Sequence, residues 1–275
     1  MRRPGAWLLG GVGIVLTTVL FVVPFLFIFL TAGKTTEEAR LLDFSWPSEW
    51  AIVENVRAVF EARDYMLVIA FINSTILTVA SVTILVVLGS MVAFVLQRRK
   101  SRINPLVDFL ILSGLIIPPA VVPTIWVLQG MGLFRTMIGL ILVEVAFGMA
   151  FVVLLIRAFV STIPRDLDEA AIIDGAGPVR LFFRVILPLL KSVIITVVVV
   201  QSVAIFNDFA NPLYFLPGDE NATVQLTLYN FQSQYSTQYN LLFTNILLIT
   251  IPPLVMFLFF NRRIVAGMTA GAVKG

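Results

Sequence analysis

The stretch MLVIAFINSTILTVASVTILVVLGSMVAFVL (residues 66–96) contains no charged side chain. About 20 apolar residues in a helix cross the roughly 30 Å hydrocarbon core of a bilayer, so this stretch is long enough for one complete crossing. Five further apolar stretches lie at residues 7–31, 105–128, 138–156, 192–214 and 241–261. The sequence therefore predicts an all-α integral membrane protein with six transmembrane helices. Pro118, Pro119 and Pro123 predict that the third of these helices is kinked or broken.

The composition agrees with a membrane protein and excludes other classes. Hydrophobic residues make up 59% of the 275 residues and charged residues only 13%, whereas soluble domains are about 45–50% apolar and about 25% charged. The chain has no His and no Cys, which removes the imidazole base, the thiolate nucleophile and the His/Cys zinc site. We therefore expect no catalytic residues, no metal site and no nucleic-acid partner for this chain.

The positions of Lys and Arg predict the orientation, because inner loops of membrane proteins are enriched in both. With the N-terminus in the cytosol, the inner segments hold fourteen of the nineteen basic residues, mainly in 98–102, 157–191 and 262–274. The outer segments hold the other five. We therefore expect both termini in the cytosol and a multi-pass location in the cell (cytoplasmic) membrane.

The two longest outer connections differ in composition. Residues 32–65 are rich in acids, with apolar residues at roughly helical spacing, which predicts an amphipathic helix on the outer membrane surface rather than a binding site. The apolar residues of that helix are Trp46, Trp50, Val53, Val56 and Phe60. Residues 215–240 contain Pro217-Gly218 and many amides and hydroxyls, which predicts a solvated loop.

The 157–191 loop is the longest predicted inner connection, and it has helix signals. Ser161 or Thr162 is expected to cap a first helix that begins near Pro164. Gly175 follows where a left-handed residue would end that helix, and Pro178 is suited to open a second one. Composition alone leaves two interpretations open: a helix pair lying idle under the membrane, or a surface that docks another protein.

The order of residues in this loop resembles a known family. Glu169-Ala170-Ala171, three residues, Gly175, nine residues and Val185-Ile186-Leu187-Pro188 closely resemble the EAA motif of permease subunits of binding-protein-dependent ABC importers. Only Val185 departs from the pattern, which has isoleucine there. The C-terminal residues 261–275 are similar to the tail of maltose-type sugar permeases. Together with Asn73-Ser74 and Asn207-Asp208, the similarity runs from about residue 66 to the end.

This resemblance implies a type I ABC importer permease fold and a division of labour. The first helix and outer segment would occupy 1–65, the permease core 66–261, and a cytosolic tail 262–275. The chain lacks the phosphate-loop pattern G-x-x-x-x-G-K-[ST], so it would bind no cofactor, and ATP and Mg²⁺ would belong to a partner ATPase. The implied partners are an ATPase dimer, a second homologous permease, an extracytoplasmic sugar-binding protein, the sugar and the lipid bilayer.

The resemblance also implies two ATPase contacts on this chain. The coupling contact would be made by Glu169, Ala170, Ala171, Asp174, Gly175 and Pro188. The tail contact would be made by Thr269, Ala270, Gly271 and Lys274, with a frayed terminus as the alternative.

Polar side chains within the predicted spans are candidates for the substrate pathway, because burying them in a membrane is costly. They are Asn73, Glu144, Asn207, Asp208 and Asn211, of which the last three are expected on or near one helical face. Glu144 has two open roles: lining the pore, or pairing with the partner permease. A further acid, Asp108, is expected to snorkel or to pair with Arg102.

The predicted function is the transmembrane half-channel of an ATP-driven importer of a sugar or oligosaccharide. One alternative is import of a polyol or a glycerol phosphodiester by the same machinery, for which Arg135 is the one basic candidate on the outer path. A second is an ion-coupled secondary transporter, which would show internal repeats and midplane charges. A membrane-embedded enzyme is disfavoured because paired carboxylates are also missing.

Overall fold

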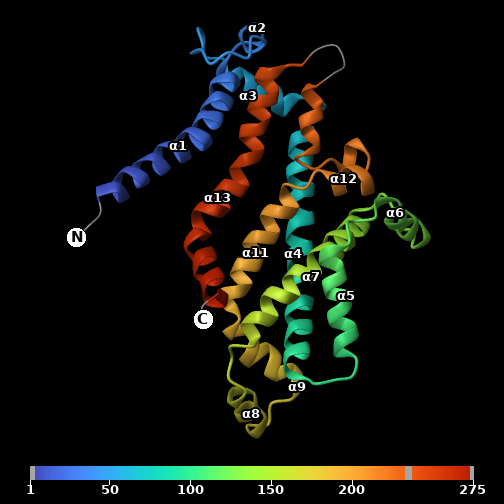
Figure 1. The fold of residues 1–275 in the computed structure, drawn as a ribbon. Coiled ribbons are helices and arrows are strands. Elements are labelled where there is room, and N and C mark those ends of the chain that lie inside the picture. The colour runs from blue at the N-terminus through green and yellow to red at the C-terminus, as the bar shows by residue number, and fades with distance from the viewer. Residues whose placement is uncertain (1–3, 233–236, 273–275) are drawn as a thin grey trace. The chain divides into compact units, whose positions relative to one another are not determined.

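The computed structural model describes the backbone of residues 4–232 and 237–272 and the side chains of 11–232 and 237–260. The regular secondary structure of the described residues is helical apart from one isolated bridge between Gln232 and Thr237 (Figure 1). It divides into two compact units, residues 1–69 with 226–251 and residues 70–225 with 252–275. Each unit is described by itself.

The first unit is assembled around a buried asparagine. It contains α1 (Pro4–Gly33), α2 (Thr36–Ala39), α3 (Ile52–Glu61), η3 (Leu226–Phe231) and the start of α13 (Tyr239–Ala272). Asn55 of α3 donates to the carbonyls of Ala32 and Lys34, both at 2.9 Å, and accepts from Asn240 of α13 at 2.8 Å. The last carbonyls of a helix have no partner within it, so Asn55 both closes the end of α1 and joins three segments.

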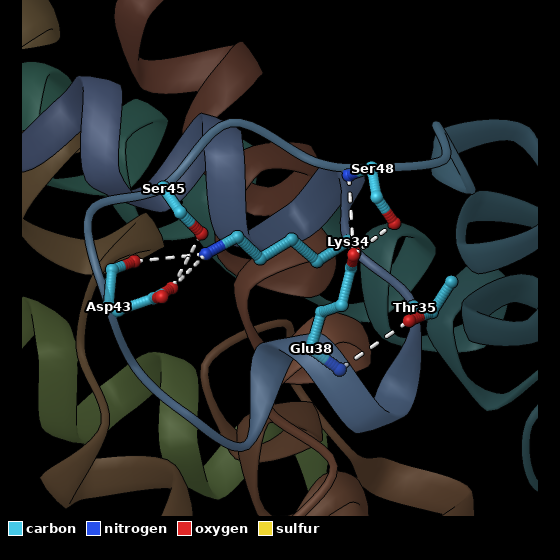
Figure 2. Close-up of polar contacts among 6 residues, drawn as sticks. All are labelled: Lys34, Thr35, Glu38, Asp43, Ser45 and Ser48. Atoms are coloured by element: carbon cyan, nitrogen blue, oxygen red, sulfur yellow. Dashed lines mark hydrogen bonds and ion pairs between the residues drawn. The ribbon is translucent and has the colours of Figure 1, made fainter.

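An ion pair and a hydroxyl bond organise the segment after α1 (Figure 2). Lys34, only 1% exposed, donates to the Asp43 carboxylate at 2.5 Å and to the Asp43 carbonyl at 3.0 Å. The lysine bond and a second bond from Ser45 hold the pKa of Asp43 below its ordinary value. The hydroxyl of Ser48 donates to Glu38 and lowers the pKa of that carboxyl too. These contacts close residues 34–48 into one folded loop.

The amphipathic helix expected in this outer segment is shorter than predicted. Trp46 and Trp50 precede α3 in non-helical backbone and pack edge to face, with ring centroids 5.5 Å apart. Trp46 and Val53 remain 70% and 72% exposed. The helix begins only at Ile52 because the preceding residues are held in the loop of Figure 2.

The second unit packs around α7 (Met137–Val160). Four other helices of this unit lie beside it: α4 (Met66–Arg98, which begins in the first unit), α5 (Asn104–Ile116), α11 (Lys191–Phe206) and α12 (Ala210–Phe215). Of these, α5, α11 and α12 have the more extensive contacts with α7. The α4–α7 approach is close at two glycines: an added Cβ would lie 2.6 Å from Val152 at Gly89 and 2.9 Å from Leu85 at Gly148. Small residues at such crossings are typical of membrane helices.

The predicted spans are only partly continuous helices. Within the described chain, four helices are long and apolar enough to cross a membrane: α1, α4, α7 and α13 up to Phe260. The predicted break in the third span is confirmed, since α5 ends at Ile116 and α6 (Val121–Gly130) begins after the proline pair. A fifth span results if the bent pair 178–189 and 191–206 is counted as one. The number of six crossings stays a prediction.

The prediction that 215–240 is simply a solvated loop is wrong. Ala222, Val224 and Phe231 are 1%, 0% and 6% exposed. The segment contains η2 (Asp219–Asn221) and η3, and its backbone is held by Asn73 and Ser74 of α4. The polar composition of this segment predicted exposure to solvent, because the sequence does not show which of its few apolar residues are buried.

Candidate functional site

The 157–191 loop folds as a helix, a glycine turn and a second helical limb. Its first helix, α8 (Asp166–Ile173), carries three acids in the first turn, where the helix dipole favours negative charge. Gly175 has a φ of +81°, and its N–H donates to Ile172 while that of Ala176 donates to Ala171, both at 2.9 Å. This pair of bonds is the Schellman arrangement that ends helices at glycine. The prediction of a left-handed Gly175 is confirmed.

The predicted cap of α8 is wrong. The residue before its first turn is Arg165, with no capping side chain. Ser161 and Thr162 instead bond back to the carbonyls of Ala158 and Phe159, at 2.7 and 2.8 Å. The two hydroxyls therefore finish α7 rather than begin α8, a choice that the sequence alone leaves open because both helix ends have unpaired groups.

The residues of α8 separate into an attached face and a free face. The side chain of Asp168 is mostly buried, and Ala171 packs against the core of the second unit. Four of the predicted coupling residues, Glu169, Ala170, Asp174 and Gly175, are exposed. The attached face therefore holds α8 in place while its other side stays open to a partner.

The free face also carries apolar residues that the motif does not name. Ile172 and Ile173, at the end of α8, are 58% and 84% exposed. Adjacent large apolar side chains that stay exposed are typical of a surface that contacts another protein or a membrane. In the sequence, the feature that could have indicated this surface is the pair Ile172-Ile173 at the end of a short helix rich in acids.

The second limb changes helical geometry before it reaches α11. It runs through α9 (Pro178–Arg180), the π-helix η1 (Leu181–Ile186) and α10 (Leu187–Leu189), where Pro188 occupies the first turn. The axis then bends by 77° into α11. Single-turn π segments are often found at functional sites, and here the segment coincides with the end of the EAA-like spacing.

The predicted tail residues up to Gly271 lie at the C-terminal end of α13, where the structure describes the backbone alone. The backbone of α13 stays helical through Ala272, so it includes Thr269, Ala270 and Gly271. Lys274 lies outside the described residues. The tail assignment stays a prediction.

Three of the predicted pathway residues meet between α7 and α12 in the second unit. Glu144 of α7 is 6% exposed and accepts from the amide of Asn211 at 3.1 Å. Asp208 lies close to the Glu144 carboxyl and accepts from the backbone N–H groups of Ala210 and Asn211, at 2.8 and 3.3 Å. Glu144 is thus paired within its own chain, whereas the sequence suggested the pore or another subunit.

The other two pathway candidates hold the polypeptide that follows α12. Both amide contacts of Asn73 go to backbone, to the carbonyls of Glu220 and Ala222 at 3.2 and 3.1 Å. Asn207, which is exposed, accepts from Gln225 at 3.0 Å. The expectation that Asn207, Asp208 and Asn211 share one helical face is wrong, because α11 ends at Phe206 and Asn211 belongs to α12.

The expected Asp108–Arg102 pair is also replaced. Asp108 of α5 forms an ion pair with Arg157, near the end of α7. Arg157 also donates to Gln97 of α4 at 3.3 Å. These contacts join the C-terminal end of α4, the first half of α5 and the C-terminal end of α7.

These features define a helical membrane protein with an exposed helix–glycine turn–helix loop. The family described as the binding-protein-dependent transport system inner membrane component matches residues 85–270. This chain belongs to that family. The family consists of transport components and not of catalytic subunits.

Named relatives extend the match over most of the chain. The diacetylchitobiose uptake system permease protein NgcG of Streptomyces coelicolor is 31% identical over 95% of this chain and 87% of its own length. The melibiose/raffinose/stachyose import permease protein MelC of Bacillus subtilis is 34% identical over 75% of this chain and 76% of its own. A bacterial ABC transporter that imports the acidic polysaccharide alginate has a chain of the same fold, with a TM-score of 0.80 at 16% identity over 95% of this chain and 98% of that one.

Proposed function

We propose that this chain is the transmembrane permease of an ATP-driven importer and forms half of the pathway for a sugar or oligosaccharide. The observation that carries the proposal is the exposure of α8 and its turn: Glu169 and Ala170 of α8 and Gly175 of the turn after it are exposed at the EAA-like spacing, while the opposite face of α8 is anchored. A chain without a phosphate loop needs a separate ATPase, and α8 is the surface offered to it.

Two observations support a sugar as the transported solute: the chemistry of the side chains near α12, and the substrates that the names of the relatives give. Asn207 presents an exposed amide and Asp208 a partly buried carboxylate. Hydroxyl-rich, neutral solutes hydrogen bond to such groups without needing an opposite charge. Glu144 plays a supporting part, because its carboxylate already accepts the Asn211 amide and is nearly enclosed.

The complete transporter would contain this permease, a second homologous permease, two ATPase subunits and an extracytoplasmic sugar-binding protein. Closing of the ATPase pair would move α8, and the helices attached to it would change which side of the membrane the pathway faces. Six spans with both termini in the cytosol place α8 on the ATPase side.

Reconstitution of the complex in proteoliposomes tests this function. Labelled di- and oligosaccharides should enter only with the binding protein outside and ATP at the ATPase side. Uptake of a glycerol phosphodiester or a polyol, but of no sugar, would support the alternative cargo. Uptake that follows an ion gradient without ATP would contradict the importer assignment.

A further inference from the structure

The C-terminal end of α4 is attached to the first turn of α8 by a shielded ion pair. Arg98 Nε lies 2.7 Å from Asp168 Oδ2, and the two side chains are 12% and 13% exposed. A terminal nitrogen of the same guanidinium lies 3.4 Å from Asp168 Oδ1 and donates to the carbonyl of Ile163 at 2.9 Å. One side chain of α4 therefore contacts both α8 and the segment that leads into it.

A second, apolar connection links α4 to the other limb of the 157–191 loop. The rings of Phe94 and Phe182 have centroids 5.7 Å apart. Met91, Phe94 and Val95 of α4 also line an apolar pocket of about 180 Å³ together with Val179, Phe182 and Phe183. The last two turns of α4 thus contact both limbs of the loop.

The ion pair and the apolar contact differ in how strongly they oppose relative movement of α4 and the loop. Apolar surfaces slide past one another at small cost because packing has no preferred direction. Separating a shielded ion pair leaves a charge with little solvent around it, which is strongly unfavourable. The route from α8 through the second limb to α11 includes a π-helix and a 77° bend, so it is less direct than the Arg98 contact.

We propose that Arg98 is the positioning residue that makes α8 and the C-terminal end of α4 move as one body, so that α4 receives the motion of the ATPase. This inference rests on the proposed docking of α8 on an ATPase. It adds a specific mechanical link that the EAA-like spacing does not contain, since Arg98 lies outside the motif. Neighbouring Arg99 is exposed and serves as the comparison.

A cysteine pair tests the link in the assembled transporter, because the chain has no Cys of its own. The double variant Arg98→Cys with Asp168→Cys should transport at least about fivefold more slowly than wild type while the ATPase subunits still co-purify, since coupling energies of this kind correspond to about 5- to 150-fold effects. A short thiol-specific cross-linker that joins the two cysteines should restore most of the transport and the number of solutes moved per ATP.

Single variants separate this link from a general loss of folding. Arg98→Gln should lower the number of solutes moved per ATP, whereas Arg99→Gln, which removes the same charge one residue away, should leave it unchanged. Asp168→Asn, nearly identical in shape to the native residue, should behave like Arg98→Gln. Equal coupling in the Arg98 and Arg99 variants, or a cross-link that stops transport, would overturn the proposal. An inactive wild-type complex, or one that binds no ATPase, would instead refute the proposed function.

Discussion

The contacts of the buried acid Glu144 could not be predicted from the residues around it in the sequence. Its carboxylate lies between α7 and α12, with the Asn211 amide as donor and Asp208 close by. A polar group that is removed from water needs a partner, and a buried pair is strongly specific for the helix that supplies it. The residue therefore attaches α12 to the long helix of the second unit.

Substitution of Glu144 should separate attachment from sugar contact. Glu144→Gln keeps an acceptor for Asn211, so the thermal unfolding temperature in detergent should fall only slightly. Glu144→Leu leaves the amide unpaired, which costs about 1–3 kcal/mol, and should lower that temperature clearly. A transport loss of more than about tenfold in stable Glu144→Gln, equivalent to about 1.4 kcal/mol, would show that the carboxylate contacts the solute instead.

The Lys34–Asp43 pair should make the outer loop sensitive to acid. Because the folded-state pKa of Asp43 is lowered, the ion pair stabilises the fold above the ordinary carboxyl pKa, and this stabilisation is lost as the pH falls through the folded-state value. Asp43→Asn should therefore lower the unfolding temperature most at about pH 7. The difference from wild type should begin to shrink below the ordinary Asp value of about 3.9 and should disappear only below the lowered folded-state pKa of Asp43.

The partner substitution provides a matched comparison. Lys34→Met should be milder than Asp43→Asn at neutral pH, because it leaves a half-exposed carboxylate that water can solvate, whereas Asp43→Asn leaves an ammonium group that is 1% exposed. The same loss for both variants at every pH would contradict this account of the loop.

At the scale of elements, the 157–191 loop combines a rigid turn with an adjustable limb. The Schellman bonds at Gly175 end α8 sharply, while the π-helix and the bend at Leu190 interrupt the limb that enters α11. Bonds of the first kind resist deformation, and irregular helical turns are where long helices bend most easily. The loop is thus rigid at the Gly175 turn, where we expect a partner to bind, and more easily bent where its second limb joins α11.

Two glycines of the loop provide a controlled test of that turn. An added Cβ would meet nothing within 4 Å at either Gly175 or Gly177, but Gly175 has a φ of +81° and Gly177 a φ of −69°. Gly175→Val should therefore cost about 1–3 kcal/mol of backbone strain and reduce transport and solute-stimulated ATP hydrolysis. Gly177→Val should be close to wild type in both assays, and equal effects of the two would remove the turn from the coupling mechanism.

At the scale of the molecule, the two units use different kinds of contact. The first is joined by buried amides, with Asn55 bonded to α1 and α13, and the second by apolar packing around α7.

Reporter fusions test how the whole chain crosses the membrane. Fusions after Arg99, after Ile172 and at the C-terminus should report the cytosol, and one after Asp219 the outside. One inverted reporter would contradict the topology, because each crossing sets the side of the next.

The sequence by itself determined the helical membrane class, the break at the proline pair, the left-handed Gly175 and the family, because these follow from apolar length, proline, glycine and spacing. Only the tertiary structure decided that Ser161 and Thr162 finish α7, that Asp108 pairs with Arg157, and that Asn73 holds the backbone of η2 and of Ala222 after it. Apolar length and backbone preference act within one element. Which of several similar polar groups meet depends on how each helix is rotated about its axis, as with Arg98 and its exposed neighbour Arg99, and that rotation is set by packing between elements distant in sequence.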